Sequence, residues 1–172
     1  SVGPKVWDEI TASVVEGMGK DKPDAPFSGD RFITSWNALP ERSKNLLFNS
    51  TGKGNLARDI QDIVKLSGAQ KNLNKYANPS GSGRLATFTG MAGAAWAAPL
   101  PTIATILGGT VMARVLAQPV TVKAVKQFAQ AQEAVQQNPN PARMAALRNA
   151  SVNLAATINR HLGVNVSAGD FL

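Results

Sequence analysis

Hydrophobic side chains recur at three- and four-residue steps along most of this chain, a spacing typical of helices with one buried face. In the first such stretch Pro4 stands at a first-turn position, and Gly17 and Gly19 mark the end. The apolar positions of this stretch are Val6, Trp7, Ile10, Val14 and Met18. Because they fall on one helix face, we expect a helix that buries them, followed by a charged, proline-containing connector over residues 20–26.

Two short helices and a longer one are expected next. Ser28 can cap the first short helix by accepting a hydrogen bond near Arg31, and Pro40 separates it from the second. The longer helix is expected over about residues 55–76, after a break at the glycines around position 53. Aromatic and aliphatic residues on the inner faces of this region form the predicted structural core, which comprises Trp7, Ile10, Phe32, Trp36, Leu39 and Phe48.

The composition changes at residues 78–84, where Asn, Pro, Ser and Gly predict a flexible linker. It separates an N-terminal helical lobe with an aromatic core, residues 1–77, from an Ala-rich basic helical lobe, residues 85–172. No segment shows the sustained alternation of a half-buried strand. The pattern therefore predicts an all-α bundle of about six to eight helices in two lobes.

The second lobe ends in two well-marked helices. One is expected to begin at Pro119, and the other to run over about residues 142–161 after an Asn-Pro-Asn-Pro turn. The short tail that follows, residues 164–172, is expected to be an extended arm.

Residues 85–113 carry no charge and are bracketed by Arg84 and Arg114. Their number permits a membrane span. However, small residues dominate the segment, and Pro99 and Pro101 interrupt it, which favours a packed helical hairpin. Both interpretations stay open. The bulky residues that would dock on a membrane or a partner are Trp96, Leu100, Ile103, Ile106 and Leu107.

The net charge of +7 is concentrated in the second half of the chain, where Glu133 and Asp170 are the only acids after residue 83. Such a field attracts phosphate backbones and anionic lipid surfaces. It is also compatible with cations that only keep an Ala-rich bundle soluble. The candidate contacts to nucleic acid or to an anionic surface are Arg84, Arg114, Lys123, Lys126, Arg143, Arg148 and Arg160.

Reactive groups are scarce. The chain has no cysteine, and His161 is its single histidine, which leaves a poor ligand set for a metal. The first-lobe glutamates Glu9, Glu16 and Glu41 fall on exposed helix positions, whereas a glycan-cleaving acid usually sits in a cleft. We therefore expect no catalytic residue, cofactor, metal or small-molecule substrate.

Residues 32–48, which read Phe-Ile-Thr-Ser-Trp-Asn-Ala-Leu-Pro-Glu-Arg-Ser-Lys-Asn-Leu-Leu-Phe, resemble a segment of large structural proteins of tailed bacteriophages. In those proteins a Phe-x-x-x-Trp-x-x-Leu run leads to a Leu-Phe end, a Gly-bearing turn, an amphipathic helix and an Asn-Pro-Ser-Gly linker. This chain has the same order, with residues 55–76 as the helix and 78–81 as the linker. The likeness spans roughly residues 5–120.

The resemblance implies a helical module of a phage internal or DNA-ejection protein, carried in the virion and delivered with the genome to the host envelope or periplasm. It implies a structural protein that contacts other virion proteins or itself, with DNA or an anionic membrane as further partners. The sequence starts at Ser1 and shows no signal peptide, so we expect a processed product or a fragment. The alternative, based on charge alone, is a basic helical module that binds nucleic acid.

Overall fold

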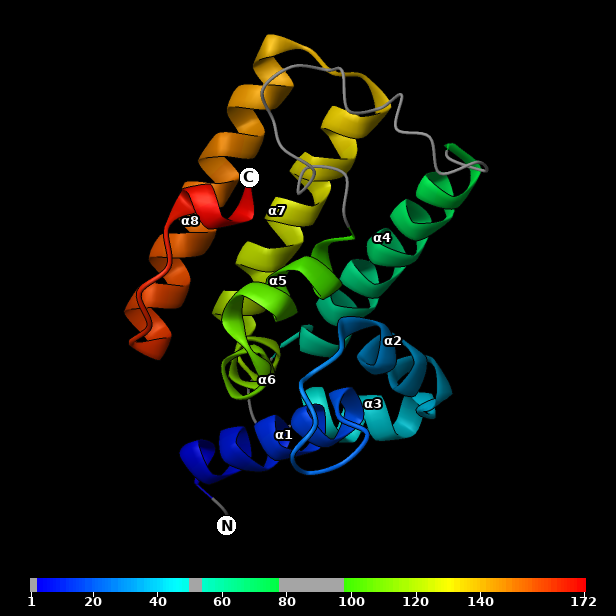
Figure 1. The fold of residues 1–172 in the computed structure, drawn as a ribbon. Coiled ribbons are helices and arrows are strands. Elements are labelled where there is room, and N and C mark those ends of the chain that lie inside the picture. The colour runs from blue at the N-terminus through cyan, green and yellow to red at the C-terminus, as the bar shows by residue number, and fades with distance from the viewer. Residues whose placement is uncertain (1–2, 50–53, 78–97) are drawn as a thin grey trace.

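The computed structural model describes residues 3–49, 54–77 and 98–172, which fold into helices joined by short connections (Figure 1). No strand occurs in these ranges, so the predicted all-α fold is confirmed. The described residues form eight α-helices and one short 3-10 helix, namely α1 (Pro4–Gly19), α2 (Gly29–Ala38), α3 (Glu41–Phe48), α4 (Leu56–Ala77), α5 (Pro99–Leu107), α6 (Gly109–Ala117), α7 (Pro119–Gln137), α8 (Pro141–Leu162) and η3 (Ala168–Phe171).

Helix boundaries follow from proline, capping residues and glycine. A proline in the first turn leaves no helical hydrogen bond unmade, because the first N–H groups of a helix have no partner within it. Such prolines open α1, α5, α7 and α8. The Ser28 hydroxyl accepts a hydrogen bond from the N–H of Arg31 at 3.2 Å, which confirms the predicted cap of α2. At the far end of the chain Gly163, with a φ of +66°, ends α8.

The helices of the two predicted lobes pack into one body. Figure 1 shows α7 and α8 running antiparallel to each other, with α4 on the other side of α7 and α1 to α3 gathered at one end. Helix α1 packs against α6, α4 packs against α7, and buried residues from both parts belong to one hydrophobic core. The change in composition at residues 78–84, which lie outside the described ranges, therefore does not separate two lobes in the packing.

Glycine allows one of these close approaches between the two parts. A Cβ atom on Gly29, the first residue of α2, would lie 2.7 Å from the Cα atom of Pro101 in α5. Only a residue without a side chain fits there. The start of α2 therefore rests directly on the first turn of α5.

The aromatic core of the N-terminal region is built from Phe32, Trp36 and Phe48, each fully buried. The Trp36 ring lies 5.9 Å from that of Phe32 and 5.0 Å from that of Phe48, the latter edge to face. The indole N–H of Trp36 donates to Oε1 of Gln61 in α4 at 2.9 Å. The rings thus join α2, α3 and α4. Leu39 packs at the edge of this core and is half-buried.

The buried face of α1 differs from the predicted one. Ile10 is 39% exposed and Trp7 is half-buried, so Ile10 is not the core residue that its spacing indicated. The fully buried side chains described in α1 are instead those of Thr11 and Val15, one turn apart. The Thr11 hydroxyl can donate to the carbonyl oxygens of Trp7, at 2.8 Å, and of Leu47, at 3.3 Å. A small hydroxyl residue therefore faces α3, which turns the larger Ile10 outward.

The second part of the uncharged segment forms two short helices. Pro99 and Pro101 lie in the first turn of α5, and the break falls at Gly108, with a φ of +75°, between α5 and α6. The prolines therefore begin a helix within the uncharged segment. The earlier half of the predicted hairpin, together with Trp96 and Arg84, lies outside the described residues.

The C-terminal tail folds back onto the bundle, and the expected extended arm is wrong. Phe171 in η3 is 1% exposed, and its ring lies 6.1 Å from the ring of Phe128 in α7. The Asn159 side chain holds the tail through Val166, donating to its carbonyl at 2.8 Å and accepting from its N–H at 2.9 Å. An aromatic residue near the end of the chain thus completes the core between α5, α7 and α8.

Candidate functional site

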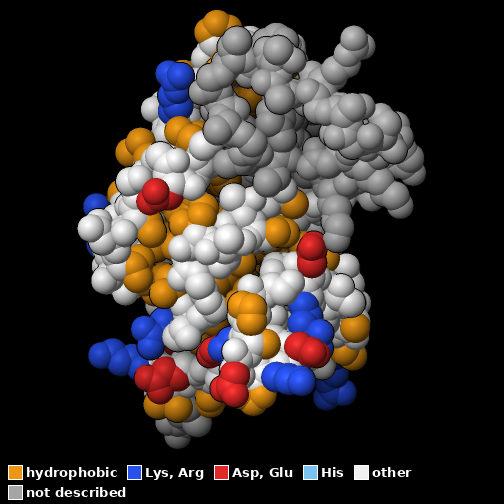
Figure 2. Space-filling model, in the orientation of Figure 1, with side chains coloured by type: hydrophobic (Ala, Val, Ile, Leu, Met, Phe, Trp, Pro, Cys, Tyr) orange, Lys and Arg blue, Asp and Glu red, His pale blue; other side chains and the backbone are white. Residues whose placement is uncertain are grey.

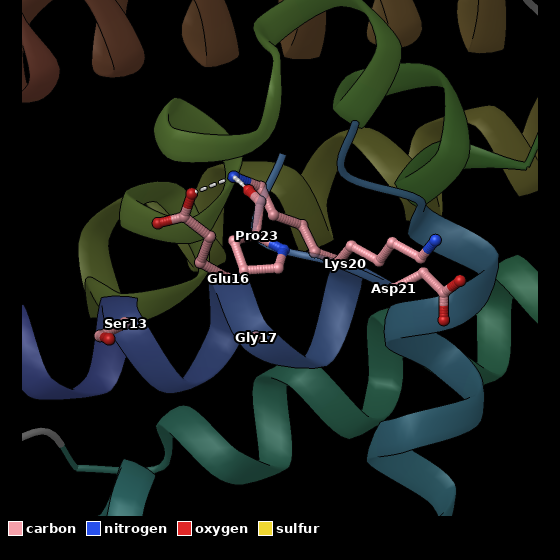
Figure 3. Close-up of a pocket in the computed structure, with 7 residues that line it drawn as sticks. Ser13, Glu16, Gly17, Lys20, Asp21 and Pro23 are labelled. Carbon is pink, nitrogen blue, oxygen red and sulfur yellow. Dashed lines mark hydrogen bonds and ion pairs between the residues drawn. The ribbon is translucent and has the colours of Figure 1, made fainter. Parts of the chain in front are cut away.

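A pocket of about 400 Å³ lies between the outer face of α1 and the connector that follows it (Figure 3). Its lining residues are Ser13, Glu16, Gly17, Lys20, Asp21, Lys22 and Pro23. Figure 3 shows Glu16 and Lys20 reaching toward each other across the pocket, while Asp21 points away from them. The helix places Ser13 and Gly17 one turn apart, and Lys20 follows at its C-cap, so the pocket runs along the end of the helix as a shallow groove.

Most charged groups of this pocket already have partners. The Lys20 ammonium is paired with Glu16, and the same carboxylate oxygen accepts from the Thr110 hydroxyl at 3.5 Å. The Asp21 carboxylate pairs with Arg31 at 2.6 Å. A general acid must present its carboxyl group to a substrate. Glu16 is instead turned toward Lys20 and Thr110 of its own chain.

The predicted cationic contacts divide into engaged and exposed groups, and Lys126 is the clearest engaged one. From α7 its ammonium contacts Asp59 at 2.8 Å and Asp62 at 2.7 Å, both on α4. Hydrogen bonds to Asp59 and to Asp62 raise the pKa of Lys126 above the ordinary value of 10.5. Its charge ties two helices together, so Lys126 is a poor candidate for contact with an external phosphate.

Arg143 is also engaged. Its guanidinium donates to the carbonyl oxygens of Ala134 at 2.8 Å and Asn138 at 3.3 Å, at the end of α7. A cation at this position satisfies carbonyl groups that a helix end leaves without partners. The residue therefore holds the α7–α8 turn, and its charge is directed at the chain itself.

Four of the predicted cations are exposed, and these are Arg114, Lys123, Arg148 and Arg160. Since α7 and α8 are antiparallel, Lys123 and Arg160 lie at the same end of this helix pair (Figure 1). Arg114 shares a second pocket with Asp8 and Glu9 of α1, so acids partly offset its charge. Figure 2 shows one face of the molecule, where side chains of both signs mix over the lower part.

The four predicted docking residues that the structure describes face inward. Leu100 and Ile103 are fully buried in the core, and Ile106 and Leu107 are partly buried against it. Helix α5 packs on α2, α4 and α6, so these side chains are covered by the chain itself. This corrects the expectation that they dock on lipid or a partner. In the described part of the chain no helix is both long enough and apolar enough to cross a membrane.

Metal-binding groups do not converge. His161 is exposed in the last turn of α8, where the helix dipole favours a basic residue. Within the described ranges no three residues of the His, Cys, Asp and Glu types lie close enough to hold a metal ion.

Two polar features escaped the sequence reasoning. Lys44 is 6% exposed, contacts Glu41 at 2.7 Å and lies 5.3 Å from the centre of the Trp36 ring. The second feature is the pair of acids that holds Lys126. Asp59 is 67 residues away from Lys126 in the sequence. The only local signal is that Asp59 and Asp62 are three positions apart on α4, which puts them on one helix face. A search for acid pairs on one helix face would have suggested a cationic partner, although not which one.

The geometry thus combines a shallow groove with paired charges, four exposed cations among the predicted contact residues, and a buried apolar segment. No protein-family model, curated protein or solved structure matches this chain.

Proposed function

We propose that this chain is a non-catalytic structural module of a phage virion protein that assists genome delivery through assembly with other virion proteins or with itself. The phage origin rests on the resemblance of residues 32–48 and the segments around it. The observation that carries the non-catalytic part is the use of charged side chains between helices, above all Lys126 with Asp59 and Asp62. Groups committed to helix contacts do not converge on a substrate.

An assembly role needs an outward surface, and the apolar segment 98–107 does not provide one because its large side chains are buried. The exposed large hydrophobic residues of the described part are Val6, Ile10, Leu46, Val120 and Val152. Val6 and Ile10 lie one turn apart on α1, and they are the only two of these five residues that share a helix. We place the contact surface of the module on α1 for this reason.

Sedimentation velocity from low to high micromolar concentration tests self-assembly. We expect a defined oligomer that the double variant V6S/I10S weakens, while the control V152S, at an exposed valine of α8, leaves it unchanged. A monomer at every concentration, or equal association of all variants, would contradict this surface. Flotation with anionic vesicles tests the membrane that the resemblance implies as a further partner. If the chain does not float with the vesicles, membrane contact is excluded and the assembly proposal is unaffected.

A murein-release assay tests the absence of catalysis. We expect no release above a heat-denatured sample, and the same result for the alanine variants of Glu9, Glu16 and Glu41. Release that one of these variants abolishes would show that the module is an enzyme.

The second candidate function is nucleic-acid binding, favoured by the exposed side chains of Arg114, Lys123, Arg148 and Arg160. If all of them contact phosphates of a duplex, the logarithm of the binding constant falls with that of the salt concentration at a slope of about −3 to −4. Fluorescence anisotropy with a labelled duplex measures this slope. A salt-independent signal, or a slope that the variant K123Q does not reduce, would exclude the candidate.

A further inference from the structure

The tail, residues 163–172, lies on the bundle as a short segment of its own. Gly163 reverses the chain after α8 with a φ of +66°, and a Cβ atom there would meet nothing within 4 Å. Figure 1 shows the tail running back along α8 from this turn, and η3 packs on α8 and α5. The turn is a pivot outside the packed core, and the tail beyond it contacts the helices as a bound peptide would.

Side chains of the tail alternate between the helices and solvent. Val164 and Val166 pack against the core, whereas Asn165 between them is exposed. This period of two is typical of an extended segment that lies on a surface. Phe171, which is 1% exposed, then places its ring 6.1 Å from that of Phe128 in α7. The tail thus presents spaced valines and one aromatic anchor to the groove formed by α5, α7 and α8.

Hydrogen bonds hold the tail in two separate ways. From α8 the Asn159 side chain donates to the carbonyl oxygen of Val166 at 2.8 Å and accepts from its N–H at 2.9 Å. One amide side chain thus binds the backbone of the tail as a neighbouring strand would. Within the tail, Ser167 and Asp170 form a reciprocal capping box that fixes η3. Because the capping box is internal to the tail, the tail keeps it when it leaves the helices.

We propose that the groove between α5, α7 and α8, with Phe128 and Asn159 as its contact residues, is a peptide-binding site that accepts the tail of a second copy of this chain. The chain's own tail, seated in the groove, shows which side chains fit, and a second copy carries the identical segment. Exchange of identical tails replaces each contact with the same contact, so both grooves stay filled. The inference rests on the proposed self-assembly and adds a second contact to the one on α1.

Concentration decides between a copy's own tail and that of its neighbour. A short tether gives the own tail an effective concentration on the order of millimolar, so a dilute chain keeps its own tail in the groove. Copies that the α1 contact holds side by side have a comparable local concentration. From Gly163 to Phe171 an extended tail reaches on the order of 30 Å, which is enough to cross to a neighbouring copy. Exchange therefore accompanies assembly.

A synthetic peptide of residues 163–172 tests the groove directly. We follow the anisotropy of the labelled peptide as it is titrated with the full F171A chain, which has the groove and Asn159 but a tail without its ring. We expect saturable binding that is about tenfold or more weaker for the same peptide carrying F171A, because the buried ring is lost. Wild-type chain is expected to bind the unmodified peptide more weakly than the F171A chain does, since its own tail competes.

Equal binding of the two peptides, or no saturable binding to a folded F171A chain, would overturn the proposal. Thermal unfolding checks that the F171A chain is folded. If it is not, the same two peptides are compared on the wild-type chain at millimolar concentration. Preference for the peptide with the ring supports the groove there, and no preference overturns it.

Two complementary variants test exchange between copies. F171A keeps the Asn159 clamp and lacks the ring, whereas N159A keeps the ring and lacks the clamp. A groove with its clamp and a tail with its ring then meet only between two different chains. We expect unlabelled N159A to shift the Asn159 side-chain amide signals of isotope-labelled F171A in a saturable way in NMR spectra. The matched control, the double variant N159A/F171A, is expected to cause no such shift.

The mixing experiment is repeated with V6S/I10S added to every chain, which separates tail exchange from the α1 contact. A saturable shift in either background supports tail exchange, whatever sedimentation shows for α1. Absence of the shift in both backgrounds with folded variants, or equal shifts from N159A and its control, would overturn exchange between copies. If N159A does not fold, the peptide titration decides, because it needs only chains with Asn159 in place.

Discussion

The aromatic region of α2 to α4 and the Ala-rich pair of α7 and α8 build their cores in different ways. In the first, Phe32, Trp36 and Phe48 fill the space between three helices with rings. In the second, small buried residues such as Ala124 of α7 and Ala155 of α8 line two long helices that pack together, and Phe171 from the tail adds its ring to that of Phe128 in α7. Stabilisation is thus concentrated in few side chains in one region and spread along an interface in the other.

The largest effect is expected from W36A. The substitution removes a fully buried ring and leaves Gln61 in α4 without its hydrogen-bond donor. We expect the free energy of unfolding to fall by about 3–5 kcal/mol, measured by urea denaturation. The control L46A, at a residue that is 58% exposed in α3, is expected to change it by less than about 0.5 kcal/mol. If W36A lowered the free energy of unfolding by less than A129L does, stability would not be concentrated in the rings.

The variant F171A tests whether the tail belongs to the core of the second region. Phe171 is buried against Phe128, but the short tail can adjust when the ring is removed. We therefore expect a loss of about 3 kcal/mol, at the low end for a buried ring. Hydrogen exchange at residues 164–172 is expected to rise with it, while exchange in α2 and α3 stays slow. The control is V152A, at an exposed residue of α8. If it lowered the free energy of unfolding as much as F171A does, Phe171 would not be a core residue.

Close helix contact in the second region predicts sensitivity to added volume. Ala129 is fully buried in α7, in a helix pair that Gln127 and Asn153 also bridge by a hydrogen bond of 3.1 Å. We expect A129L to destabilise the chain by about 1–3 kcal/mol because a fully buried alanine leaves no room for the extra methylene groups. The matched control A145L, exposed on α8, is expected to be near neutral. A neutral A129L in thermal unfolding would indicate loose packing in this region.

Helix ends were easier to predict from the sequence than buried helix faces. Prolines, Ser28 and Gly163 mark helix ends through local backbone chemistry, which needs no knowledge of the tertiary fold, so the all-α elements were predictable. The face of α1 was not, because Thr11 is buried by a hydroxyl contact to α3 that hydrophobic periodicity cannot register. The local sequence pattern predicts where helices begin and end, whereas the buried face of a helix depends on the element that packs against it.

The candidate sites were less predictable than the fold. Charge alone put Lys126 and Arg114 in one class, yet one ties α7 to α4 and the other lines a pocket with acids of α1. Both outcomes depend on helices that are far apart in sequence. The burial of Leu100 has the same origin, since an uncharged run looks alike whether it meets lipid or its own chain.

The smallest expected effect concerns the ion pairs that join the two regions. Lys126 has a raised pKa in the folded chain, so its contribution to stability is fully present below its ordinary value of 10.5 and is lost as the pH rises through the folded value. Because its side chain is 23% exposed, we expect K126M to cost about 1 kcal/mol near pH 7. The difference from wild type should shrink above pH 10.5, whereas the control K123M, exposed on the same helix, should show no such trend. Urea denaturation across the alkaline range measures both, and a K126M difference that is independent of pH would mean that packing of the lysine stem, and not its charge, joins α4 to α7.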